Sequence, residues 1–150
     1  MTSHPAETPR KARDGQMGLT FPQELDARAR LAFRAQFATG EMSYSAFLVR
    51  TVLTYVAQLE AEQNGGQPWP PVTAAEMPRG GRGAQPGITK KTVSTYPTPE
   101  EGNRIRGTAV GLDKTVGVLV TEALQAAVED IPPGSRGQVG RGRPIGPSTP

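Results

Sequence analysis

The sequence contains no cysteine and a single histidine, His4. Without cysteine the chain forms no disulfide and offers no thiolate nucleophile or ligand. A lone histidine in a polar segment has no neighbour with which to form a metal site or a catalytic pair. There is no phosphate-binding loop of the GxxxxGK[ST] type and no carboxylate cluster away from helix starts. We therefore expect neither an enzyme nor a bound metal or cofactor.

Long apolar runs and aromatic residues are also scarce, the latter making up 5% of the chain. No run approaches the roughly 20 apolar residues that a membrane-spanning helix needs. The first residues lack the apolar segment of a secretion signal. We expect a soluble, cytoplasmic protein with a small core and no membrane association.

Glycine and proline are abundant, with 18 Gly and 15 Pro. They gather in three stretches that we expect to lie outside the packed core. These are a disordered basic arm (1–15), a Pro/Gly-rich linker (61–90) and a disordered Arg/Gly/Pro tail (132–150). The net charge of +3 is concentrated in the same stretches, as expected of arms that contact a polyanion and equally of solvated tails. Trp69, in the linker, is expected to dock on the protein's own core.

Residues 16 to 21 predict a short β-strand. Apolar Met17, Leu19 and Phe21 alternate with small or polar residues, which is the period of a half-buried strand. Pro22 ends the strand and suits the first turn of a helix.

Two helices are predicted after this strand and complete a first unit over residues 16 to 60. Apolar residues recur in both at three- and four-residue spacings. Gly40 is a natural end for the first helix, and Ser43 or Ser45 can cap the second. One strand and two helices bury too little surface to stand alone, so the unit needs a partner.

Residues 91 to 131 predict a second unit with the same order of elements. A capping box, Thr98-Pro99-Glu100-Glu101, marks the start of its first helix. This helical stretch is about one turn shorter than its counterpart from proline to glycine. Asp113 or Thr115 can cap the last helix.

The orientation of the second strand is open from the sequence. Burying Tyr96, its largest side chain, is preferred because the largest apolar surface gains most from burial. This phase turns Lys91, Val93 and Thr95 outward. The opposite phase exposes Thr92 and Ser94.

The repeated order of strand, proline, amphipathic helix, glycine and Ser/Thr-rich cap resembles the ribbon-helix-helix family of DNA-binding proteins. The caps are followed by LVRTVL (residues 48 to 53) and by LVTEAL (residues 119 to 124). The resemblance implies a mainly α fold with a short β ribbon. It implies two such units, joined as an intrachain pseudo-dimer or as an intertwined dimer, whose paired strands enter the major groove.

The resemblance assigns the outward strand residues to DNA bases: Gln16, Gly18 and Thr20 in the first strand, and Lys91, Val93 and Thr95 in the second. Gln can pair with adenine through two hydrogen bonds, and Thr can contact a thymine methyl group. Gly18 brings no side chain to the middle position. Apart from the resemblance, such residues can equally be the solvated side of a half-buried strand.

Phosphate contacts are expected where the second helix of each unit starts, because free N–H groups and the helix dipole favour anions there. The residues concerned are Ser43, Tyr44 and Ser45 in one unit, and Lys114 and Thr115 in the other. The N-terminal arm adds Arg10, Lys11 and Arg13, which can follow the DNA backbone.

The resemblance implies sequence-specific binding of double-stranded DNA by a transcriptional repressor or a plasmid-partition (centromere-binding) protein. A tail could also reach a protein partner, such as a partition ATPase or a toxin. The alternative is an antitoxin-like helical dimerisation and protein-interaction module that acts through its flexible tails.

Overall fold

The computed structural model describes residues 15–77 and 88–131. Its elements in chain order are β1 (Met17–Pro22), α2 (Gln23–Gln36), α3 (Tyr44–Gln63), η1 (Ala74–Glu76), β2 (Lys90–Thr95), α4 (Pro99–Gly111) and α5 (Val116–Ala127). A strand followed by two α-helices therefore occurs twice. The expected mainly helical fold with a short β ribbon is confirmed.

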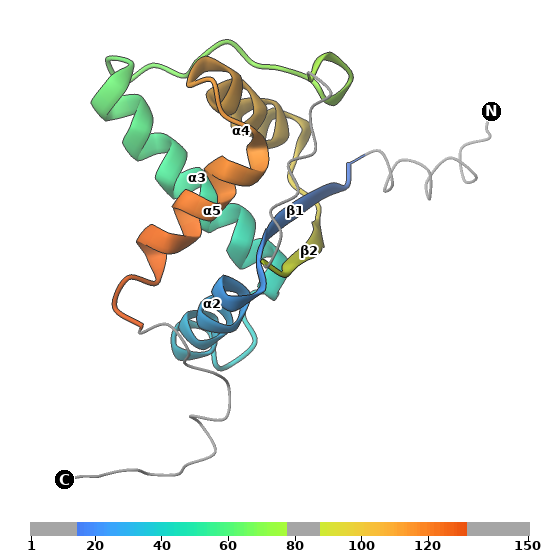
Figure 1. Ribbon diagram of the computed structural model, residues 1–150, viewed down its shortest axis with the longest axis vertical. Helices are drawn as coiled ribbons and strands as arrows, with labels where there is room; N and C mark the ends of the chain where they lie inside the picture. Colours follow the sequence, from blue (N-terminus) through green and yellow to red (C-terminus); the bar gives the residue numbers. More distant parts are fainter. Residues whose placement is uncertain (1–14, 78–87, 132–150) are drawn as a thin grey trace, which may run out of the picture.

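The two strands form an antiparallel ribbon within one chain. Met17 lies opposite Thr95, and Pro22 lies opposite Lys90. Figure 1 shows this ribbon along one side of the helices, with α2 following one end and α4 following the other.

The second α-helix of each half, α3 or α5, joins the two halves of the chain. α3 packs against α5, and each also packs against the strand of the other half, α3 against β2 and α5 against β1. The fully buried core accordingly draws on both halves: Leu19, Phe21, Leu48, Val52, Val56, Ile105, Leu119, Val120 and Leu124 have no or almost no exposed surface. Neither half closes this core alone, so folding couples the two.

Local capping sets the starts of α3 and α5 at one of the two positions that the sequence allows for each. The Ser43 hydroxyl accepts a hydrogen bond from the Ala46 N–H, and the Thr115 hydroxyl accepts one from the Val118 N–H, both at 3.1 Å. The capping box of α4 is closed in both directions between Thr98 and Glu101.

Asp113, the alternative cap for α5, is not its cap. It lies in the turn before that helix with a φ of 61°, in the left-handed region where Asp is tolerated better than most residues. The second unit is shorter mainly in this turn, because α2 has 14 residues and α4 has 13. The connection between helices spans residues 37–43 in the first unit and only 112–115 in the second.

The preferred phase of the second strand is wrong. Thr95 is fully buried, while Tyr96 keeps 61% of its surface exposed. Pro97 is buried, so the inward positions of this strand are Val93, Thr95 and Pro97. Thr95 is accommodated because its hydroxyl donates to the Met17 carbonyl oxygen at 2.7 Å. Tyr96 is left outside, where its hydroxyl group meets water.

The segment after α3 packs on α4 as an extended strap. Trp69 lies against the core, as expected from the sequence. The Val72 N–H donates to the Asn103 carbonyl oxygen at 3.1 Å, and Arg106 Nε donates to the Val72 carbonyl oxygen at 3.0 Å. Much of the predicted linker up to Met77 therefore has a defined path over the surface of the second unit.

Candidate nucleic-acid interface

One face of the β1–β2 ribbon is turned away from the helices, and we call it the outer face. It consists of Gln16, Gly18 and Thr20 on one side and Lys90, Thr92 and Ser94 on the other. All six are exposed except Thr20, which is half-buried. None is acidic and only Gly18 lacks a polar side chain, so the face suits an anionic, hydrogen-bonding partner.

Hydrogen bonds across the ribbon hold the polar side chains of this face. The hydroxyl oxygens of Thr20 and Thr92 lie 2.8 Å apart, and Gln16 Nε2 donates to Ser94 Oγ at 2.7 Å. A Cβ atom added at Gly18 would lie 3.3 Å from the Thr92 methyl carbon. The outer face therefore has no side chain at Gly18 and carries hydrogen-bonded side chains on either side of it.

The structure moves three predicted base-contacting residues to the other side of the ribbon. Lys91, Val93 and Thr95 point toward the helices, with Thr95 fully buried and the other two half-buried. Lys91 Nζ lies 3.6 Å from a carboxylate oxygen of the buried Asp26. Because side chains alternate along a strand, the outward places go to Lys90, Thr92 and Ser94. The sequence left Thr92 and Ser94 open as the opposite phase, whereas Lys90 was assigned to the linker.

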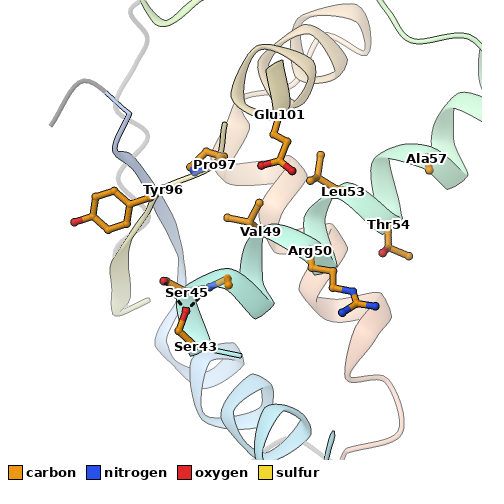
Figure 2. A pocket seen from close by; sticks show the side chains of 11 residues that line it. Ser43, Ser45, Val49, Arg50, Leu53, Thr54, Ala57, Tyr96, Pro97 and Glu101 are labelled. Atoms are coloured by element: carbon orange, nitrogen blue, oxygen red, sulfur yellow. Dashed lines mark hydrogen bonds between the residues drawn. The ribbon is translucent and has the colours of Figure 1, made fainter. Parts of the chain in front are cut away.

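Tyr96 extends the outer face by one position. It follows β2 directly and continues the register opposite Gln16. Its ring points away from α3 in the close-up view of Figure 2. The sequence prediction buried this residue, whereas the structure leaves most of it exposed and buries Pro97 instead.

The first turn of α3 lies beside the end of β2. Ser43, Ser45 and Ala46 line an open groove of about 660 Å³ together with Tyr96 and Pro97 (Figure 2). The first N–H groups of a helix have no partner within it. The start of α3 therefore presents free donors and the positive end of the helix dipole close to one end of the ribbon.

The first turn of α5 occupies the matching place beside β1. A Cβ atom added at Gly117 would lie 3.6 Å from the Thr20 carbonyl oxygen. Thr115, the cap, is exposed. Lys114 is less free, because its ammonium group lies 2.6 Å from a Glu122 carboxylate oxygen. The backbone and Thr115 are thus better placed to meet a phosphate here than Lys114.

Tyr44 is not available as a phosphate ligand through its hydroxyl group. That hydroxyl donates to Asp26 Oδ1 at 2.8 Å, and the Arg30 guanidinium lies 4.1 Å from the ring centre. Burial, and next the hydrogen bond to Asp26, raise the pKa of Tyr44. Its side chain anchors the start of α3 on α2, while its backbone N–H remains at the helix start.

The remaining sequence candidates, Arg10, Lys11 and Arg13, lie outside the described residues, as does His4. Over residues 15–77 and 88–131, no three His, Asp or Glu side chains gather in a way that could hold a metal ion. Nor does any helix in these ranges combine the length and apolarity needed to cross a bilayer.

Comparison of this chain with protein-family models, with curated proteins and with solved structures finds no match.

Proposed function

We propose that this protein binds double-stranded DNA by placing the β1–β2 ribbon in the major groove. The chain then acts as two ribbon-helix-helix-like units joined in a pseudo-dimer. The observation that carries the proposal is the ribbon itself, an antiparallel pair backed by α3 and α5 with an exposed outer face free of acids. A two-stranded ribbon fits the major groove, which is roughly 12 Å wide.

Base edges would be contacted from the outer face. The Gln16 amide can pair with adenine, and the hydroxyl and methyl groups of Thr20 and Thr92 suit hydrogen bonds and thymine methyl contacts. Lys90, exposed at the Thr20 end, can contact a phosphate or a guanine.

Phosphates on both sides of the groove would be held by the helix starts. The first turns of α3 and α5 lie beside opposite ends of the ribbon. Each supplies free N–H groups and a capping hydroxyl, from Ser43 and from Thr115 respectively. A clamp at each end fixes the ribbon in the groove without itself selecting a sequence.

Sequence-specific binding of this kind serves a transcriptional repressor or a plasmid-partition protein bound to its centromere. Both roles need a DNA contact, and the partition role also needs a contact with another protein. The segments outside the described residues are long enough to provide the latter.

The test replaces Thr20 by Glu and measures electrophoretic retardation of random DNA fragments at low salt. A carboxylate on the outer face repels the phosphates and the acceptor groups of the bases, so we expect at least a tenfold loss of affinity, about 1.4 kcal/mol. Gln125→Glu is the matched control, because it adds the same charge at an exposed position in the last turn of α5, away from the ribbon and from both helix starts. This variant should bind like the wild type, and circular dichroism checks that both remain folded.

Equal binding by Thr20→Glu and the wild type contradicts the proposal. If binding survives this substitution but disappears on deleting residues 134 to 150, the arginine-containing tail is the binding segment instead.

A further inference from the structure

The two halves of the outer face carry different side chains. The middle of the ribbon is the opposed pair Gly18 and Ser94. Toward one end Thr20 faces Thr92, and toward the other Gln16 lies opposite Tyr96. A rotation of the ribbon by half a turn about its middle would place Gln16 on Thr92 and Thr20 on Tyr96.

The inward side of the ribbon follows this half-turn rotation approximately. The rotation would bring Met17, Leu19 and Phe21 onto Val93, Thr95 and Pro97, all of which point inward. The scaffold is therefore nearly two-fold symmetric, whereas the groups offered to DNA are not.

The two ends of the face also differ in chemistry. One end holds two hydroxyl and two methyl groups, fixed by the 2.8 Å contact between Thr20 and Thr92. The other holds an amide and a phenol, with the Gln16 amide oriented by its hydrogen bond to Ser94. Hydroxyl and methyl groups favour different bases from an amide, which pairs best with adenine.

The spacing assigns the two ends to different base pairs. Gln16 and Thr20 are four residues apart on a strand, which is roughly 13 Å at about 3.3 Å per residue. That distance spans about four base pairs at roughly 3.4 Å each. One ribbon thus contacts two parts of a short site with two different sets of groups.

We infer that this protein recognises a non-palindromic DNA sequence, with one chain bound to each site. A palindrome matches a protein whose two halves are identical, since operator symmetry mirrors protein symmetry. Here both strands of the ribbon belong to one chain and differ at every outer position. This inference rests on the proposed DNA binding and specifies its target.

The first experiment selects bound sequences from a random DNA pool with the wild-type chain and measures the mass of the complex. The expected result is a motif that differs from its own reverse complement, bound by one chain. A palindromic motif, or two chains on each site, overturns the inference.

Single substitutions on opposite ends of the ribbon sharpen the test. Gln16→Ala should relax base preference at one end of the motif, and Thr92→Ala at the other, each by roughly 5- to 100-fold. Relaxation of both ends by either variant would mean that two copies contribute equivalent strands, which contradicts the inference.

A variant with the same outer residues on both strands tests whether the outer face causes the asymmetry of the motif. Thr92→Gln, Ser94→Gly and Tyr96→Thr together place Gln, Gly and Thr on both strands, all at exposed positions. The motif selected by this variant should become palindromic. A folded variant that still selects the wild-type motif shows that the outer face does not set the asymmetry.

Failure of this inference is distinguishable from failure of the proposed function. The inference alone is overturned if the wild type retards DNA, Thr20→Glu does not, and the motif selected by the wild type is palindromic. Absence of any retardation overturns the proposed function and the inference together.

Discussion

Gly107 and Gly111 lie on α4 where the Trp69 strap crosses it. A Cβ atom at Gly107 would lie 2.2 Å from the Pro70 carbonyl oxygen, and one at Gly111 would lie 2.3 Å from Trp69 Cδ1. These glycines lower the intrinsic stability of the helix by about 1 kcal/mol each. Their lack of a side chain lets the strap approach the helix axis closely.

We predict that Gly111→Ala lowers the free energy of unfolding by about 1 to 3 kcal/mol, because the indole must move. Gly102→Ala is the control. There the nearest atom is Nη2 of Arg106, 3.2 Å from the added Cβ, and a shift of a few tenths of an ångström relieves this contact, so the gain in helix propensity should dominate and stabilise the protein by up to about 1 kcal/mol. Urea denaturation followed by Trp69 fluorescence measures both. Stabilisation by Gly111→Ala would show that the strap does not rest on the helix.

A second residue-scale prediction concerns Tyr44 at alkaline pH. Its pKa is raised in the folded protein, by burial first and by Asp26 second. An acid with a higher pKa in the folded state contributes stability that is fully present below its unfolded pKa, near 10, and is lost as the pH rises above that value. The free energy of unfolding should therefore fall above about pH 10.

Tyr44→Phe should show a smaller fall over the same range, since phenylalanine cannot ionise. At pH 7 the variant should lose about 1 to 2 kcal/mol, because Asp26 loses a hydrogen-bond donor. Urea denaturation at pH 7 and at about pH 10.5 provides the comparison, with Tyr96→Phe as a control on an exposed ring. If the free energy of unfolding falls equally in Tyr44→Phe and in the wild type, the fall does not come from the ionisation of Tyr44.

At the scale of elements, an ion pair between a half-exposed arginine and a buried carboxylate joins the end of α3 to α4. Arg104 Nε lies 2.9 Å and Nη2 lies 2.7 Å from the two carboxylate oxygens of Glu60, whose side chain is only 7% exposed. Two parallel hydrogen bonds fix both distance and orientation. The pair connects helices from different halves of the chain.

Arg104→Met should lower the free energy of unfolding by about 3 kcal/mol, because it leaves the Glu60 carboxylate buried without a counter-ion. The double variant Glu60→Met with Arg104→Met should recover most of that loss. Lys114→Met breaks a pair whose carboxylate, on Glu122, is more exposed than that of Glu60, and should cost less than about 1 kcal/mol. Thermal or urea unfolding of the four proteins measures this, and equal losses for both single variants would contradict it.

At the scale of the whole molecule, both strands of the ribbon and the helices α3 and α5 of the shared core belong to one chain. The melting temperature should therefore not depend on protein concentration between about 1 and 100 µM, because no association step accompanies folding. Calorimetry across this range measures it. A melting temperature that rises with protein concentration would mean that a second copy of the chain completes the ribbon.

Helix starts were predictable because capping joins residues only three positions apart. Ser43, Thr98 and Thr115 each accept a hydrogen bond from the third following N–H, so each cap depends only on residues close in the sequence. The inward side of β1 was also predictable from neighbouring residues, because apolar Met17, Leu19 and Phe21 alternate with small or polar residues.

The orientation of β2 could not be predicted from residues close in the sequence. Its residues carry similar polarity on both sides, so alternation favours neither phase. Pro97 and the register with β1 decide it, through the burial of Thr95 and its hydrogen bond to Met17. The outer face on β2 therefore consists of Lys90, Thr92 and Ser94, and it extends to Tyr96.

The sequence by itself determined the repeated order of strand and two helices, the caps and the apolar stripes, because each depends on residues within one or two turns. The tertiary structure alone decided that the ribbon forms inside one chain, which groups share its outer face, and that the glycines of α4 receive the Trp69 strap. These features depend on contacts between residues more than 30 positions apart. No local periodicity records such contacts, since they arise only when both halves bury their apolar faces together.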